Sequence, residues 1–244
     1  MRYLASISYD GSNFYGFERQ PRKRTIQGEL EKVLTKIDKH KVEIKGAGRT
    51  DRYVHAYDQH IHFDLKQNIP VKNIKLAMNA YLPSDIRCNS VIAVSDDFHA
   101  RHDCIQKEYR YYINVGKYDV MKDKYLYNYN SELNIKKMKE ATKHLLGKHS
   151  YKAFCSGERE NYNSTIDKIT ISKKGNILEF IFVGKSFYRY MVRNMMGLLL
   201  LVGQERVEPI MVKEILDKGD ENHKYKTAPA CGLYLYKVKY DLSK

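Results

Sequence analysis

The apolar pattern of the first hundred residues predicts four strands and two helices. Apolar residues alternate with polar ones in the strand segments and recur every three or four positions in the helical ones. The strands are expected at 3–9, 42–44, 57–65 and 86–94, and the helices at 26–37 and 71–81. Thr25 precedes the first helix and is a good N-cap. The resulting order is β-α-β-β-α-β.

The rest of the chain repeats that order. Strands are expected at 109–115, 165–173, 177–183 and 232–240, and helices from about Asn134 to 146, over 187–202 and from Pro209. We therefore predict an α+β fold of two ferredoxin-like βαββαβ halves, 1–100 and 101–244. The simplest assembly is one continuous, mostly antiparallel sheet with helices on one face. A ligand is then expected on the open face or in a cleft between the halves.

Charge suggests a polyanionic partner for this fold. Lys and Arg number 43 against 29 Asp and Glu, a formal net charge of +14. Nucleic acid is the first expectation and an anionic membrane surface the second, while a solvated, Lys-rich surface is the alternative. The Lys-, Asn- and Tyr-rich loops 11–24, 116–133 and 147–164 are candidates for RNA contact.

The cysteines and the apolar segments narrow the class of protein that is expected. The four cysteines form no CxxC pair, so neither a disulfide framework nor a cysteine zinc site is expected. The longest apolar run, Met195 to Val202, is too short to span a bilayer, and the alternating N-terminus does not resemble a signal peptide. We therefore expect a cytoplasmic protein without a membrane segment.

Asp51 is the first candidate for chemistry. It follows Gly46-Ala47-Gly48-Arg49-Thr50 in a predicted turn between two strands. Arg49 and Arg52 would keep its carboxylate ionised, and the glycines would let another group approach. Such a carboxylate is either part of an Asx turn and paired with an arginine, or a nucleophile toward an electrophilic carbon.

The surrounding motif closely resembles the catalytic motif of the TruA family of tRNA pseudouridine synthases. Further segments match the family in the same order along nearly the whole chain. They are Tyr9-Asp10-Gly11-Ser12, Gly16-Phe17, Arg19-Gln20, Thr25-Ile26-Gln27-Gly28, Gly48-Arg49-Thr50-Asp51, Val54-His55-Ala56, Tyr81-Leu82-Pro83, Asp85-Ile86, Phe98-His99-Ala100-Arg101, Lys107-x-Tyr109-x-Tyr111, Met191-Val192-Arg193-Asn194, Gly197, Ala228-Pro229 and Gly232-Leu233.

The resemblance implies an isomerase that converts uridine to pseudouridine in the anticodon stem-loop of tRNA, at the family's positions 38, 39 and 40. Asp51 would be the nucleophile in a cleft between the halves, and Arg193 the cation that pairs with it. Tyr109 would stack on the target base or donate its hydroxyl. Arg49, Arg101 and Leu233 would bind substrate. The resemblance further implies a homodimer and no cofactor.

The residues themselves leave some of these roles open. A lone Arg193 in an apolar helix would be costly without an anion, which favours the pairing, but the side chain could instead reach solvent. Tyr109 and Leu233 could be core residues. Five histidines, His55, His60, His62, His99 and His102, invite a metal site, but no Glu or Cys completes a ligand set. No metal is therefore expected.

Two departures from the family motif bear on function. Arg52-Tyr53 stands where the family has Ala-Gly, and Phe17-Glu18 where it has Trp-Gln. Tyrosine adopts positive φ less cheaply than glycine, so the turn either never needed positive φ or has been rebuilt. These replacements could shift the RNA target, or the chain could be a non-catalytic RNA-binding paralogue. A methyltransferase is disfavoured because Gly46-x-Gly48 does not open a helix.

Overall fold

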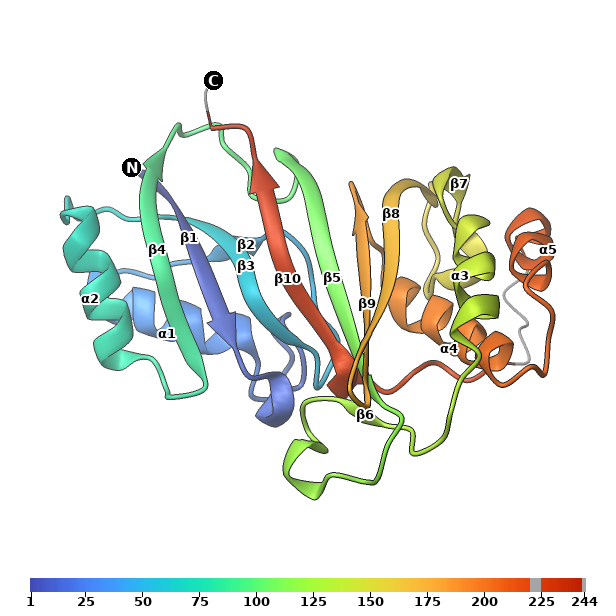
Figure 1. Cartoon of the computed structure of the whole chain (residues 1–244). Coiled ribbons are helices and arrows are strands. Elements are labelled where there is room, and N and C mark those ends of the chain that lie inside the picture. Colours follow the sequence, from blue (N-terminus) through green and yellow to red (C-terminus); the bar gives the residue numbers. More distant parts are fainter. Residues whose placement is uncertain (220–224, 243–244) are drawn as a thin grey trace. The chain divides into compact units, whose positions relative to one another are not determined.

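The computed structural model describes residues 1–219 and 225–242, which contain five α-helices and ten strands. The strands pair in a mixed, mostly antiparallel arrangement, and the predicted α+β class is confirmed (Figure 1). The chain divides into two compact units. The first holds Met1–Ile105 and the segment from Tyr234, and the second holds Gln106–Leu233.

The first unit has the predicted βαββαβ order. Its elements are β1 (Arg2–Tyr9), α1 (Ile26–Asp38), β2 (Ile44–Gly46), β3 (His55–Asp64), α2 (Val71–Tyr81) and β4 (Ile86–Val94). β10 (Leu233–Tyr240) joins it by pairing in parallel with β3, so the strand order is β4-β1-β3-β10, with β2 also on β3. The C-terminal strand, which the sequence assigned to the second half, thus pairs within the first unit. Joining of the halves into one sheet, with a cleft between them, stays a prediction.

Local sequence explains how the first unit forms. The Thr25 side chain accepts a hydrogen bond from the amide of Gly28, as expected of an N-cap. One face of the sheet buries the alternating side chains of β1 and β3, such as Tyr3, Ile7 and Ile61, at 1% exposure or less. β3 begins two residues earlier than predicted, and β2 begins at Ile44, where the sequence had it end.

A bulge in β3 changes which of its side chains reach the open face of the sheet. Ile7 pairs with Gln59 and Tyr9 with Ala56, so Tyr57 and Asp58 together lie opposite Ser8. Bulges of this kind change the direction of neighbouring side chains and are common beside functional sites. As a result His55 and Tyr57 share a face with His60, and both stack on Tyr234 of β10.

The second unit is built on four neighbouring strands in the order β5-β9-β8-β7, with β6 on β5. Its elements are β5 (Cys104–Asn114), β6 (Tyr127–Asn128), α3 (Ile135–Lys143), β7 (Gly147–Ser150), β8 (Asn163–Lys174), β9 (Ile177–Gly184), α4 (Met191–Gly203) and α5 (Met211–Lys218). The predicted β8–β9 hairpin is confirmed.

Several elements of the second unit differ from prediction. β5 begins five residues before the predicted position 109, and β6 lies within the segment 116–133, which was predicted to be a loop. β7 lies where the sequence indicated a loop, because its polar residues Gly147-Lys148-His149-Ser150 show no alternation and pair through the backbone with β8. α4 begins four residues later than predicted, after Tyr190, whose φ of +63° interrupts helical geometry. α3 ends at Lys143, before the two leucines that the pattern had included.

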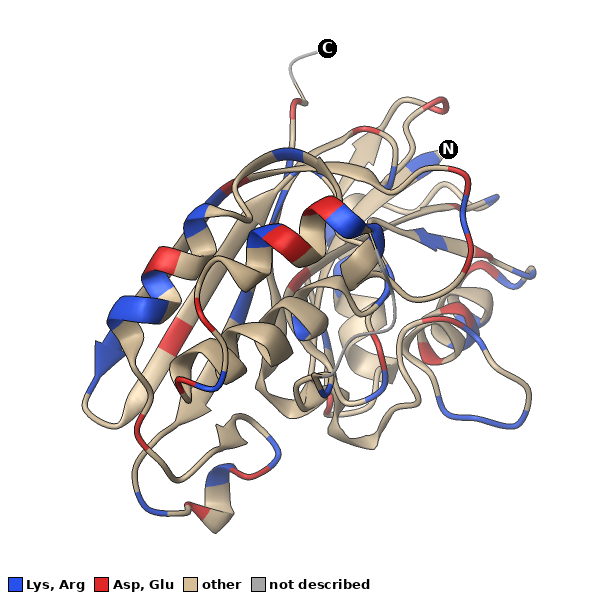
Figure 2. Cartoon of the chain, turned by 90° about the vertical axis from the view of Figure 1, so that its right-hand side faces the viewer, with Lys and Arg blue, Asp and Glu red and all other residues tan. Residues whose placement is uncertain are grey.

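Charged residues are spread over the side of the chain seen in Figure 2. Lys and Arg there lie on helices, strands and loops and are intermixed with Asp and Glu. The net charge of +14 therefore does not by itself mark an RNA-binding face on this side. Within the described residues, no helix is long and apolar enough to cross a membrane.

Candidate active site

Asp51 lies in the loop between β2 and β3, and β3 itself holds that loop in place. The amide of Ala47 donates to the carbonyl of His60 at 2.7 Å. The side-chain amide of Gln59 donates to the carbonyl of Gly48 at 2.9 Å. Gln59 is fully buried, so this second bond is shielded from water. The residues leading to Asp51 are thus fixed to a central strand.

A tight turn carries the carboxylate. The amide of Val54 donates to the carbonyl of Asp51 at 3.2 Å, which closes a turn over Arg52 and Tyr53. Tyr53 has a φ of +67°, in the left-handed region. A non-glycine residue there costs about 1–2 kcal/mol. The turn thus has positive φ at this position although tyrosine occupies it, and Asp51 remains partly exposed.

The loop at 11–24, predicted to contact RNA, packs against this turn from the other side. The amide of Phe17 donates to the carbonyl of Thr50 at 3.0 Å. Gly16 lies so close that a Cβ there would come within 2.9 Å of the same carbonyl oxygen. The Thr50 hydroxyl is hydrogen-bonded to the Tyr9 hydroxyl at 2.7 Å. Burial raises the pKa of Tyr9 to about 12, so its hydroxyl stays protonated at neutral pH.

These contacts fix the residue before Asp51 from two sides, and sequence reasoning missed their role. Gly16 and Tyr9 were noted only as parts of matching motifs. The available signal was the glycine within the long 11–24 loop, because a glycine among large residues often marks a close backbone approach.

Arg49 and Arg101, both predicted to bind substrate, lie in different places within the first unit. Arg49 forms an ion pair with Glu18 beside the Asp51 turn, and both side chains are about half exposed. Arg101 is exposed in the segment between β4 and β5, where the amide of Ala100 donates to His62. His62 lies seven residues along β3 from His55, roughly 23 Å at strand spacing. Arg101 is therefore at the other end of the unit from Asp51.

Three of the histidines considered as metal ligands, His62, His99 and His102, pack against one another. The rings of His62 and His99 lie 4.7 Å apart, and those of His99 and His102 lie 4.2 Å apart. Nδ1 of His62 and Nδ1 of His99 accept hydrogen bonds from backbone amides. In the described part of the chain, no three His, Cys, Asp or Glu residues are grouped so that they could hold a metal ion.

Arg193 belongs to the second unit and lies in the first turn of α4. It is partly exposed, whereas most residues of that helix are buried. Its Nε donates to the carbonyl of Ala228 at 2.8 Å, and the amide of Ala228 donates to the carbonyl of Arg193 at 3.1 Å. Gly197 allows this approach, since a Cβ there would lie 2.1 Å from the carbonyl oxygen of Lys226. The guanidinium is thus held in one orientation.

Tyr109 and Leu233 also belong to the second unit. Tyr109 is 6% exposed on β5, and its ring meets that of Phe187 edge to face at 5.1 Å. Leu233 is 5% exposed at the start of β10. Next to it, Gly232 packs against Tyr111, whose hydroxyl donates to the carbonyl of Pro229 at 2.7 Å. This contact fixes the segment between Ala228, the hydrogen-bond partner of Arg193, and β10.

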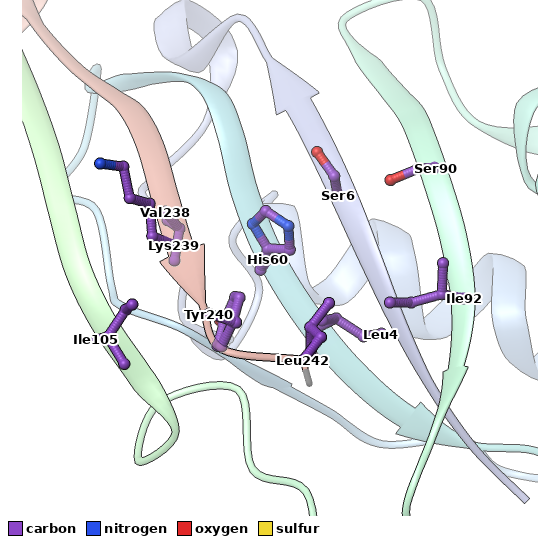
Figure 3. Close-up of a pocket in the computed structure, with 10 residues that line it drawn as sticks. All are labelled: Leu4, Ser6, His60, Ser90, Ile92, Ile105, Val238, Lys239, Tyr240 and Leu242. Atoms are coloured by element: carbon purple, nitrogen blue, oxygen red, sulfur yellow. The ribbon is translucent and has the colours of Figure 1, made fainter. Parts of the chain in front are cut away.

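A hollow of about 370 Å³ opens on the face of the first unit's sheet that carries Ser6 and His60 (Figure 3). It is lined by Leu4, Ser6, His60, Ser90, Ile92, Ile105, Val238, Lys239, Tyr240 and Leu242. Asp58 lies beside it and fixes β10 by accepting a hydrogen bond from the amide of Val238 at 3.0 Å. None of the residues predicted for the active site lines this hollow.

Comparison with known proteins agrees with the motif order. A family model described as tRNA pseudouridine synthase matches residues 5–103 and 141–241. Proteins named tRNA pseudouridine synthase A are similar to this chain over nearly its full length. The one from Staphylococcus saprophyticus is 42% identical, covering 98% of this chain and 90% of its own. The one from Bacillus subtilis is 40% identical, covering 99% and 100%.

A third relative of that name, from Listeria monocytogenes, is 43% identical and covers 98% of this chain and 99% of its own. A solved structure titled "Crystal Structure of a Cbf5-Nop10-Gar1 Complex" aligns with 81% of this chain and 54% of its own. Its identity of 13% and TM-score of 0.33 are too low to carry an argument.

Proposed function

The chain belongs to the tRNA pseudouridine synthase family, and we propose that Asp51 is the nucleophile with which it isomerises uridines in the anticodon arm of tRNA. In this reaction the bond between N1 of uracil and C1′ breaks, the uracil rotates, and C5 bonds to C1′. The proton lost from C5 is balanced by one gained at N1, so product and substrate are isomers and nothing is consumed.

The observation that carries the proposal is the bracing of the Asp51 turn. Thr50 is hydrogen-bonded through its hydroxyl to Tyr9 and through its carbonyl to the amide of Phe17. The turn itself closes through Val54. A carboxylate on a backbone fixed at three points keeps its position when a nucleotide arrives, which is what nucleophilic catalysis requires. The same bracing argues against a non-catalytic paralogue with a collapsed turn.

The second unit is proposed to complete the site. Arg193, with its guanidinium oriented by Ala228, would pair with Asp51 and keep it ionised. Tyr109 would stack on the extruded uracil, and Leu233 would line the base pocket in a cleft between the halves. The burial of Tyr109 and Leu233 and the hydrogen bond that orients Arg193 support these roles, since groups that position a base must themselves be held.

The remaining predicted contacts would serve tRNA binding. Arg49 would exchange Glu18 for a phosphate near the target nucleotide. Arg101, at the far end of the first unit, would contact a different part of the tRNA. We further propose a cytoplasmic homodimer without a cofactor. The net charge of +14 supports binding that weakens steeply with salt, because each neutralised phosphate releases counterions.

The test is turnover of uridine in unmodified tRNA. The wild type, Asp51→Ala and Asp51→Asn would be incubated with tRNA transcripts, and pseudouridine would be mapped by mass spectrometry. Wild-type product in the anticodon arm and none with either variant is expected. Asp97→Ala, which removes an exposed carboxylate after β4, is the control. No product from the wild type across total RNA would refute the activity, and turnover by Asp51→Ala would refute the nucleophile.

A further inference from the structure

Beside Asp51, cationic and aromatic side chains lie over one another. The guanidinium of Arg52 lies 4.3 Å from the ring centre of Tyr15 and 4.3 Å from that of Tyr53. The ammonium of Lys23 lies 4.5 Å from the ring centre of Tyr15. We call Lys23, Tyr15, Arg52 and Tyr53 the Tyr53 stack. Because Tyr15 belongs to the loop that braces the Asp51 turn, the stack is anchored to the same support as the carboxylate.

Tyr53 contributes little stabilising free energy to offset the strain in its backbone. Its φ of +67° is a conformation that glycine adopts at no steric cost, so tyrosine destabilises this turn. The ring does not offset that cost by burial, because Tyr53 is 40% exposed. A strained, exposed aromatic residue two positions from the proposed nucleophile calls for a role outside folding.

The chemistry of the reaction supplies such a role. A uridine must leave its base stack to reach Asp51, and its neighbours then lose a stacking partner. Aromatic rings and guanidinium groups both stack on nucleobases, and a positively charged surface holds the backbone beside them. Arg52 lies over the Tyr53 ring and so limits its rotation, which reduces the entropy lost on binding.

We propose that Tyr53, held by Arg52, stacks on the nucleobase next to the target uridine and so determines which sequence contexts this enzyme accepts. This inference rests on the proposed function, since it takes Asp51 as the reacting group. The ligand is an unpaired base of the tRNA, and purines, with larger ring faces, should be preferred at that position.

The experiment compares Tyr53→Gly with the wild type on anticodon-arm RNAs. Tyr53→Gly should raise the unfolding temperature, because strain is relieved, and raise KM about tenfold with little change in kcat, because a stacked base is lost. Tyr53→Phe, which keeps the aromatic ring, should have the KM of the wild type. Lys39→Gly is the matched control: Lys39 has a φ of +63° at the end of α1, so the variant also relieves strain but should leave KM unchanged.

Substrates with an abasic site on the 5′ or the 3′ side of the uridine identify the stacked base. At one of these sites the wild type should lose about tenfold in kcat/KM, whereas the kcat/KM of Tyr53→Gly should be the same with and without the abasic site. Equal losses for both proteins at both sites, or an unchanged KM in Tyr53→Gly, would overturn the inference. Wild-type activity is measured first. An inactive wild type refutes the proposed function, whereas an active wild type that is insensitive to the bases next to the target uridine refutes only this inference.

Discussion

Replacing Gly16 by alanine tests whether the 11–24 loop positions the nucleophile. Gly16 has a φ of +97°, and its Cβ would lie 2.9 Å from the carbonyl oxygen of Thr50 and 3.3 Å from the backbone of Asp51 and Arg52. Ordinary contact begins near 3.4 Å, so the Asp51 turn would have to move by about 0.5 Å. A misplacement of about 1 Å can cost 100-fold in rate, so we expect kcat to fall roughly tenfold.

Backbone strain is the confounding effect, and Gly147 controls for it. Gly147 also has a φ of +97°, but a Cβ there would meet nothing closer than His149 at 3.6 Å. Gly16→Ala and Gly147→Ala should therefore share a strain cost of about 1–3 kcal/mol, measured by urea unfolding. Only Gly16→Ala adds steric overlap with the turn.

The deciding measurement is kcat on a tRNA transcript at a temperature where both variants are fully folded. A kcat lowered in Gly16→Ala and unchanged in Gly147→Ala supports positioning of Asp51 by the loop. Equal kcat values for the two variants, with Gly16→Ala folded, would show that a displaced turn does not affect the chemistry. The reasoning from the bracing contacts would then be wrong.

Three further changes have expected outcomes. Glu18→Gln should lower the KM for tRNA about two- to fivefold at low salt, because Arg49 loses a competing anion, while the exposed pair contributes under about 1 kcal/mol to folding. Burial lowers the pKa of His62 to about 4. The contribution of His62 to the free energy of unfolding should therefore be complete above pH 6.5 and fall by about 2 kcal/mol as the pH drops toward 4. His62→Gln should flatten that pH dependence when unfolding is measured at each pH. Thr25→Ala removes the N-cap of α1 and should cost about 1 kcal/mol in urea unfolding.

Hydrophobic pattern was sufficient to predict the βαββαβ order of the first unit because its strands bury one face each. The alternation in β1 and β3 and the helical spacing in α1 are local properties of the sequence. β7 was missed because an edge strand of polar residues is held by backbone pairing with β8, which leaves no alternation to read. The pairing of β10 with β3 was missed because it joins segments about 180 residues apart, and periodicity carries no information about partners.

The candidate site likewise has one part that the sequence could predict and another that it could not. Motifs predicted Asp51, Arg49, Tyr109 and Arg193 as site residues, because residue type and order are visible in a sequence. They gave no account of what holds Asp51, since hydrogen bonds to a loop about 35 residues earlier have no local pattern.

For Tyr53, the sequence and the structure together support a conclusion that neither supports alone. The sequence left two possibilities open, a turn without positive φ or a rebuilt turn, and the structure has positive φ with tyrosine in that position. Glycine would give the same turn at lower free energy, so folding alone does not account for the tyrosine. An exposed ring stacked on Arg52 beside the proposed nucleophile is what a role in substrate choice would require. A purely structural role predicts that Tyr53→Gly changes stability alone, whereas substrate contact predicts that stability and KM both rise.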